Sequence, residues 1–265
     1  MLKKRIIFTL LYDGSSFALS RNFRLQKVGD LQWLQKYYDF RNISQHIDEL
    51  IVLNVGSQSC DIGQFSEVLE HLSSLCFVPI SAGGGIRSLD DAKKLMSSGA
   101  DKLVLNTPLF ENSDLIKRIY QIFGQQAIVA SLDCLKEGDD YMVYTLNGSK
   151  KISLLSECIN NFISLDMIGE FYINSIDNDG SGQGYDLQIL DCITSDCQIP
   201  VIISGGAGNS RHLADGLSHP KIDAAATANL LNFVGDGLQL ARFSLIEDGY
   251  SLAHWNSFSI LNHQG

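Results

Sequence analysis

An internal repeat constrains the fold of this chain more than any other feature of its sequence. Residues 77–85 (FVPISAGGG) match residues 199–207 (IPVIISGGA) at an offset of 121 to 122. Residues 101–107 (DKLVLNT) match residues 223–229 (DAAATAN), and residues 48–52 (DELIV) match residues 169–173 (GEFYI), at the same offset. Three matches at one offset predict two related halves, about 1–124 and 125–234, followed by a C-terminal extension over 235–265.

Eight apolar runs of strand length recur along the chain, and stretches with helical spacing separate them. The runs are 5–11, 49–55, 78–82, 102–106, 127–133, 170–175, 200–204 and 223–227. Their continuous apolar character is typical of parallel strands that are covered on both faces. Residues 88–96 and 113–119 read as amphipathic helices with a serine at the start. The 265 residues are close to the roughly 250 of an eight-fold barrel. We therefore predict an α/β fold, a single (β/α)8 TIM barrel over 1–265 built from two half-barrels.

Charge and cysteine content exclude several classes of protein. The net charge of −10 argues against binding to a polyanion, so we expect no nucleic-acid partner. The apolar run 6–12 follows basic residues, as in a secretory signal, but it ends at Asp13-Gly14 without a small-residue cleavage site. No other run approaches the ~20 residues that cross a bilayer, so we expect a cytoplasmic protein without a membrane contact. The six cysteines lack CxxC spacing, and we expect reduced thiols.

Glycine-rich turns follow the third and seventh predicted strands. These turns, 83–85 and 205–208, each lead into a helix, and exposed backbone N–H groups beside a helix start suit a phosphate. A single turn of this kind is more often only a tight turn, but the repeat predicts two on opposite sides of the barrel mouth. Asn106 and Thr107 would complete one site, and Ala228 and Asn229 the other.

Asp133 ends the fifth predicted strand, where a barrel carries its active site. A carboxylate there is a candidate general acid or base, and the alternative is a solvated loop residue. The repeat offset places Leu11 at the position opposite Asp133, so this chain has one carboxylate where a symmetric barrel would have two. Asp13 would replace the missing group only if its turn folds inward.

Two further loops carry charge. Residues 175–186 (SIDNDGSGQGYD) follow the sixth strand and suit a mobile loop that closes over a substrate. A calcium loop is the competing interpretation, but the closing glutamate at the twelfth position is missing. Residues 137–140 (EGDD) read as a hairpin tip.

Four charged residues lie at predicted strand starts, at the other end of the barrel: Arg5, Glu49, Lys102 and Glu170. If they point inward, two cations and two carboxylates would pair to offset their desolvation. The alternative is a set of exposed charges, and spacing alone leaves both open.

These motifs together resemble the cyclase (synthase) subunit of imidazole-glycerol-phosphate synthase, to about residue 234. The matching segments are 4–7 (KRII), 22–23 (NF), 28–30 (VGD), 48–50 (DEL), 83–87 (GGGIR), 99–102 (GADK), 106–107 (NT), 123–126 (FGQQ), 175–180 (SIDNDG), 184–186 (GYD) and 204–208 (SGGAG). The resemblance implies a lyase in a glutamine amidotransferase heterodimer of histidine biosynthesis. A separate glutaminase subunit would supply ammonia through the barrel, and the substrate would be a bisphosphorylated ribulosyl aminoimidazole carboxamide nucleotide.

The resemblance also implies residue roles. Asp133 falls on a catalytic aspartate, and Asp101 on the face that docks the glutaminase. Gly84, Gly85, Asn106 and Thr107 fall on one phosphate site. We assign the second phosphate site to Asp179, Gly180, Ser181, Gly205, Gly206, Ala228 and Asn229. Arg5, Glu49, Lys102 and Glu170 coincide with the ring that gates ammonia entry. We expect neither a metal nor another cofactor.

The chain departs from the family on the active-site side. Leu11 stands in place of the family's other catalytic aspartate, Leu19-Ser20 in place of a Lys-Gly pair, Asn54 in place of an aspartate and Asn229 in place of a serine. Two alternatives therefore stay open: a diverged paralogue that routes ammonia for amidation of a surface-polysaccharide sugar, and a non-catalytic barrel that activates a glutaminase. No cysteine nucleophile in a glycine-flanked elbow is present, so glutamine hydrolysis requires a partner.

Overall fold

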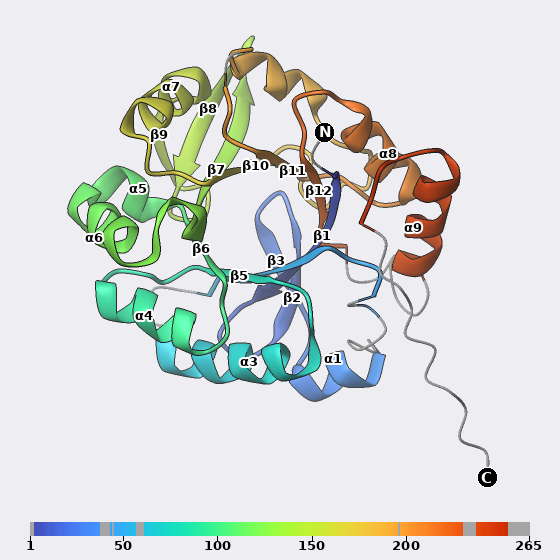
Figure 1. Ribbon diagram of the computed structural model, residues 1–265, viewed down its shortest axis with the longest axis horizontal. Helices are drawn as coiled ribbons and strands as arrows, with labels where there is room; N and C mark the ends of the chain where they lie inside the picture. The colour runs from blue at the N-terminus through green and yellow to red at the C-terminus, as the bar shows by residue number, and fades with distance from the viewer. Residues whose placement is uncertain are drawn as a thin grey trace.

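Eight parallel strands close into a barrel in the computed structural model, which describes residues 3–37, 43, 45–56, 61–195, 197–229 and 237–253 (Figure 1). The barrel strands are β1(Arg5–Tyr12), β4(Glu49–Asn54), β5(Ile80–Gly83), β6(Lys102–Leu105), β7(Ile128–Glu137), β10(Glu170–Ser175), β11(Val201–Ser204) and β12(Ala224–Thr227). They follow one another in this order, β10 pairs with β7, and the barrel closes where β12 pairs with β1. The predicted barrel fold is confirmed.

Helices surround the barrel, as the view down its axis shows (Figure 1). They are α1(Leu31–Tyr37), α3(Ile62–Leu75), α4(Leu89–Ser97), α5(Thr107–Glu111), α6(Ser113–Phe123), α7(Leu155–Leu165), α8(Ser210–Ser218) and α9(Gly237–Glu247), with 3-10 helices η1(Gln125–Ala127) and η2(Leu187–Cys192). The helix predicted over 88–96 is confirmed, because Ser88 caps α4 and Asp91 returns the contact in a capping box. The helix predicted over 113–119 is α6, which Asn112 caps.

Two antiparallel hairpins extend the barrel at its mouth. β2(Phe17–Arg21) and β3(Arg24–Gly29) follow β1, while β8(Asp140–Thr145) and β9(Lys150–Leu154) follow β7. The hairpin tip expected at 137–140 is confirmed by the pairing of Glu137 with Asp140. The prediction that the strand ends at Asp133 is wrong. β7 continues to Glu137 because its outer part pairs with β8.

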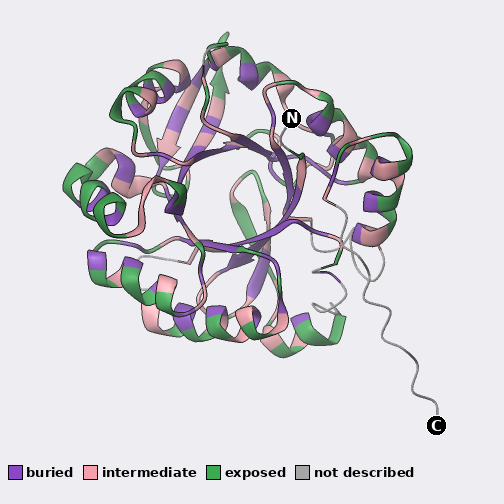
Figure 2. Ribbon diagram, in the orientation of Figure 1, coloured by how far each residue is buried: buried purple, intermediate pink, exposed green. Residues whose placement is uncertain are grey.

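The core has two layers, and buried residues follow the strands around the ring (Figure 2). The larger layer packs the strands against the helices. The smaller one fills the barrel interior and consists of Ile7, Ile51, Val104, Val129, Tyr172, Ile202, Ala224 and Ala226. These side chains alternate along the strands with outward ones, so the interior is packed rather than an open pore.

Other expectations concern the cysteines and the chain end. Cys76, Cys134, Cys158, Cys192 and Cys197 are free thiols, as expected. Cys60 and the aromatic residues of the extension, Trp255 and Phe258, lie outside the described residues. Among the helices that the structure describes, none combines the length and apolar character that a membrane span requires.

Candidate active site at the barrel mouth

A cavity of about 670 Å³ opens at the carboxyl ends of the strands. Inward-facing residues of opposite strands line it, because side chains on one face of a strand recur at every second position. On β1 this face carries Arg5 at the base of the barrel, Ile7 in the interior, and Thr9 and Leu11 in the cavity. One strand therefore connects the charged end of the barrel to its mouth.

Asp133 lies in this cavity with both carboxylate oxygens hydrogen-bonded. Asn174 of β10, the register partner of Asp133, donates to Oδ1 at 3.2 Å. Asn106, which follows β6, donates to Oδ2 at 3.2 Å. Burial raises the pKa of Asp133 to about 7, against the hydrogen bond from Asn174 and with a smaller contribution from Asp179. A carboxyl group that titrates near neutral pH can both accept and donate a proton, as general acid–base chemistry requires.

Leu11 occupies the cavity wall on the other side of the barrel, and its side chain is 8 % exposed. Asp13 does not take its place. Its carboxylate accepts from the backbone of Ser15 at 3.0 Å and Ser16 at 2.8 Å, and pairs with Lys27 at 3.1 Å. Burial alone would raise the pKa of Asp13, but these contacts together outweigh burial and lower this pKa. The turn therefore folds back on itself, and Asp13 is a local capping group.

The first predicted phosphate region lies in the large cavity, which Gly84, Gly85, Asn106 and Thr107 line. Gly84 has a φ of +89°, and a Cβ there would lie 1.9 Å from the carbonyl oxygen of Asn54. Packing alone thus requires Gly84. The side-chain amide of Asn106 donates to Asp133, to the Ser131 carbonyl and to the Tyr144 carbonyl. Asn106 therefore also positions the carboxylate of Asp133.

The second predicted phosphate region forms a smaller cavity of about 200 Å³. Of the seven assigned residues, six line it: Asp179, Gly180, Gly205, Gly206, Ala228 and Asn229. Ser181 is not among the lining residues, and its hydroxyl accepts from the backbone of Gln183 at 3.2 Å.

Asp179, which lines this cavity, also holds the β2–β3 hairpin. Its carboxylate accepts from the Ser20 hydroxyl and from the Phe23 backbone at 3.0 Å. Asn22 adds contacts from its side-chain amide to the carbonyls of Ile176 and Asp177. Burial raises the pKa of Asp179, although these donors counteract the effect. The loop expected to be mobile is thus hydrogen-bonded to the hairpin at the barrel mouth.

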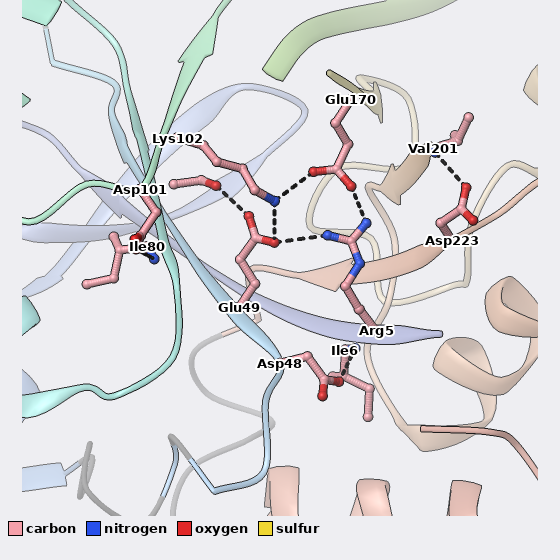
Figure 3. Close-up of polar contacts among 11 residues, drawn as sticks. Arg5, Ile6, Asp48, Glu49, Ile80, Asp101, Lys102, Glu170, Val201 and Asp223 are labelled. Carbon is pink, nitrogen blue, oxygen red and sulfur yellow. Dashed lines mark hydrogen bonds and ion pairs between the residues drawn. The ribbon is translucent and has the colours of Figure 1, made fainter. Parts of the chain in front are cut away.

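The four charges at the base of the barrel point inward and pair with one another (Figure 3). Lys102 lies 2.9 Å from both Glu49 and Glu170, and Arg5 lies 3.0 Å from Glu49 and also contacts Glu170. Ser81 donates a further hydrogen bond to Glu49. Burial lowers the pKa of Lys102, but the two glutamates outweigh it and raise this pKa overall. The interpretation as scattered exposed charges is therefore wrong.

Asp101, expected at a partner interface, is exposed beside this ring (Figure 3). Its carboxylate accepts from the Ile80 backbone at 2.8 Å, and Asp223 makes the equivalent contact with Val201 at 2.9 Å. Asp101 thus secures the start of β5, whatever else contacts it.

Two residues of β10 contribute to the site but were not predicted from the sequence. Tyr172 is buried in the barrel interior and its hydroxyl lies 2.7 Å from Ser204 Oγ. Asn174 binds Asp133. The signal was a polar residue at every second position of an otherwise apolar strand. In the described part of the chain, no cluster of three or more His, Cys, Asp or Glu could hold a metal ion.

The chain resembles known proteins along most of its length. A family described as "Histidine biosynthesis protein" matches residues 31–235. A "Putative imidazole glycerol phosphate synthase subunit hisF2" from Parasynechococcus marenigrum is 44% identical over 99% of this chain and 100% of its own. "Imidazole glycerol phosphate synthase subunit HisF" proteins are 36% identical in Exiguobacterium sp. (88% of this chain, 89% of theirs) and 34% identical in Chlorobium limicola (94% and 98%).

Proposed function

The chain belongs to the histidine biosynthesis protein family, and from this premise we propose that it is the ammonia-using synthase subunit of a glutamine amidotransferase. A separate glutaminase would dock at the end of the barrel that carries the charged ring, near Asp101. The substrate would bind in the cavity at the opposite end, and we propose the bisphosphorylated ribulosyl aminoimidazole carboxamide nucleotide as the first candidate.

The observation that carries this proposal is the closed ring of Arg5, Glu49, Lys102 and Glu170. Glu49 and Glu170 are 3% and 7% exposed, so the ring has an unusual desolvation cost for a purely structural feature. Two positive and two negative charges leave the ring neutral overall. Ammonia is itself neutral, so the ring neither attracts nor repels it through a net charge. Lys102 bonds through one flexible ammonium group, so it is the member that can swing aside for ammonia.

Asp133 would perform the proton transfers in the cavity. Its pKa of about 7 lets the carboxylate accept a proton from an attacking amine and the carboxylic acid return one to a leaving group. Asn106 and Asn174 fix the plane of this carboxyl group, so the transferred proton leaves or arrives in a defined direction.

Leu11 favours a second candidate function. With one acid–base group in place of two, the cavity is poorly equipped for a cleavage and cyclisation that require proton transfer on both sides of the substrate. The same barrel would still conduct ammonia to a different acceptor. Amidation of a surface-polysaccharide sugar would need that delivery and an activated sugar, whose own leaving group departs as the C–N bond forms. The third candidate is a barrel without catalytic activity of its own that only activates its glutaminase.

The purified chain, the ribulosyl nucleotide and a high ammonium concentration test the first candidate without a glutaminase. Formation of imidazole glycerol phosphate at a rate that Asp133→Asn abolishes would support it. If no product forms with the wild type or with Leu11→Asp, the first candidate is wrong. Asp139→Asn, in the exposed tip of the β7–β8 hairpin, is the matched control.

A second assay separates ammonia delivery from glutaminase activation. The glutaminase from the same genome is purified with this chain, and glutamine hydrolysis is measured with wild type, Asp133→Asn and Lys102→Met. If Asp133→Asn abolishes product formation by the complex but glutamine hydrolysis stays undiminished, the hypothesis of a barrel that only activates its glutaminase is wrong. An activator would not need this carboxylate.

A further inference from the structure

The β2–β3 hairpin borders both cavities at the barrel mouth, and the cavities share Ser20, Asp179, Ser204 and Ala228 as lining residues. Ser20 and Leu25, a cross-strand pair on one face, line the large cavity. The pairs on the other face line the small cavity: Leu19 with Gln26, and Arg21 with Arg24. Ser20 also borders the small cavity, so the hairpin contributes to both sites, but both arginines line the small cavity alone.

Arg21 and Arg24 are placed at an electrostatic cost. They lie directly opposite each other beside the two-residue turn of Asn22 and Phe23, which have φ values of 49° and 61°. Like charges in this position destabilise a hairpin. Within the part of the chain that the structure describes, neither guanidinium has an ion-pair or hydrogen-bond partner. Asp179, a carboxylate that lines the same cavity, is occupied by Ser20 and Phe23.

The opposite wall of the small cavity presents backbone. Gly205 and Gly206 have φ values of +92° and +103°, whereas Gly180 lies against the hairpin backbone at Ser20 and Arg21. Among the described residues that line the small cavity there is no lysine, and the cations that line it are Arg21 and Arg24. A dianionic group between these walls would meet peptide N–H groups on one side and two guanidinium groups on the other.

We propose that Arg21 and Arg24 are specificity-determining residues that bind a phosphate monoester of the substrate against the Gly205–Gly206 turn. This inference rests on the proposed function, because it assigns one end of a phosphorylated substrate to the small cavity. Guanidinium groups bind phosphate through paired N–H donors, so the arrangement favours a phosphate over a carboxylate or a neutral sugar. The bound phosphate neutralises the arginine pair and ties the hairpin to the barrel.

Titration of ¹⁵N-labelled protein with inorganic phosphate tests this assignment. Amide shifts of Gly205 and Gly206 report the small cavity, and those of Gly84 and Gly85 the large one. We expect roughly tenfold weaker binding at Gly205 and Gly206 in Arg21→Gln and in Arg24→Gln, since a hydrogen bond to a charged group contributes about that factor. Binding at Gly84 and Gly85 should not change.

Lys27→Gln is the matched control, because Lys27 lies on the same hairpin, pairs with Asp13 and lines neither cavity. Arg21→Lys with Arg24→Lys should recover only part of the affinity, since charge returns without paired donors. Wild-type affinity at Gly205 and Gly206 in the double glutamine variant would overturn the inference, and so would an equal loss in Lys27→Gln. Phosphate shifts at Gly84 and Gly85 alone would refute the arginine site and leave the proposed function standing. Shifts at neither pair would refute both.

Discussion

Leu11 of β1 and Asp133 of β7 line the same cavity from diametrically opposite strands. Three strands separate them in either direction around the barrel, β4, β5 and β6 on one side and β10, β11 and β12 on the other. The side chain that faces the acid–base candidate is therefore an apolar one, at the position where a symmetric barrel would hold its second carboxylate. This geometry makes Leu11 the first residue to change.

Leu11→Asp should increase turnover of the ribulosyl nucleotide with ammonium by about a hundredfold, because a positioned acid–base group contributes at least that much. Leu11→Asn has a similar shape but cannot transfer the proton, so it is the matched control. Steady-state kinetics at constant ammonium concentration measures the effect. An equal gain in both variants would contradict a role for the carboxylate and indicate a change of polarity alone.

Stability should report the titration of Asp133. Its pKa is about 7 in the folded protein and about 3.9 in an unfolded chain, so the folded state holds this proton more tightly. The contribution of Asp133 to stability is therefore complete below about pH 4 and is lost as the pH rises through about 7. We expect the free energy of unfolding of the wild type, relative to Asp133→Asn, to fall across this range and to become constant above about pH 8. Urea titrations at several pH values measure it, and a flat difference would contradict the shifted pKa.

The sequence predicted the barrel well because its signals are local. Runs such as 200–204 are bounded by Pro200 and the glycine turn, and the repeat matched three runs of the first half to three of the second. The β2–β3 hairpin was not predicted, since Arg24–Gly29 is polar and exposed, without the alternation that marks a half-buried strand. Its position depends on Asp179, more than 150 residues away along the chain. The partners of Asp133 were missed for the same reason: Asn174 reaches it only through the pairing of β10 with β7.

Lys102→Met should destabilise the base of the barrel. It leaves Arg5 as the cation that Glu49 and Glu170 share, beside the Ser81 hydrogen bond to Glu49, and losing one partner of a largely buried ion pair costs about 2 kcal/mol or more. Lys150→Met breaks the exposed pair with Glu111, at 2.8 Å, and should cost under about 1 kcal/mol. Chemical denaturation compares the two. Equal losses would show that the ring has no special role in stability.

The pair of Arg242 and Asp48 attaches α9 to the barrel. Both Arg242 Nη1 and Nη2 lie 2.9 Å from Asp48 oxygens, both side chains are 4% exposed, and Asp48 also accepts from the Ile6 backbone at 2.8 Å. Arg242→Met leaves a buried carboxylate without its cation and with the Ile6 backbone N–H as its remaining donor, so we expect a loss of about 3–5 kcal/mol. Glu247→Gln, at the exposed end of α9, should change stability by no more than about 0.5 kcal/mol. Hydrogen exchange localises the effect, and we expect the loss of protection to be centred on α9 and β4. A uniform loss of protection across the chain would contradict this attachment.

Gly84 and Gly85 allow packing and phosphate binding to be separated within one turn. Both have positive φ, +89° and +78°, but a Cβ at Gly84 would lie 1.9 Å from the Asn54 carbonyl oxygen, whereas at Gly85 the nearest atom is 3.7 Å away. Gly85→Ala should therefore cost only the left-handed strain of about 1–2 kcal/mol. Gly84→Ala adds a backbone clash and should cost about 3 kcal/mol or more. If the turn binds phosphate, the added methyl group of Gly85→Ala should also weaken phosphate binding at the large cavity without affecting Gly205 and Gly206. Thermal unfolding and the phosphate titration measure the two effects, and a folded Gly85→Ala variant with undiminished phosphate binding would show that this turn serves packing alone.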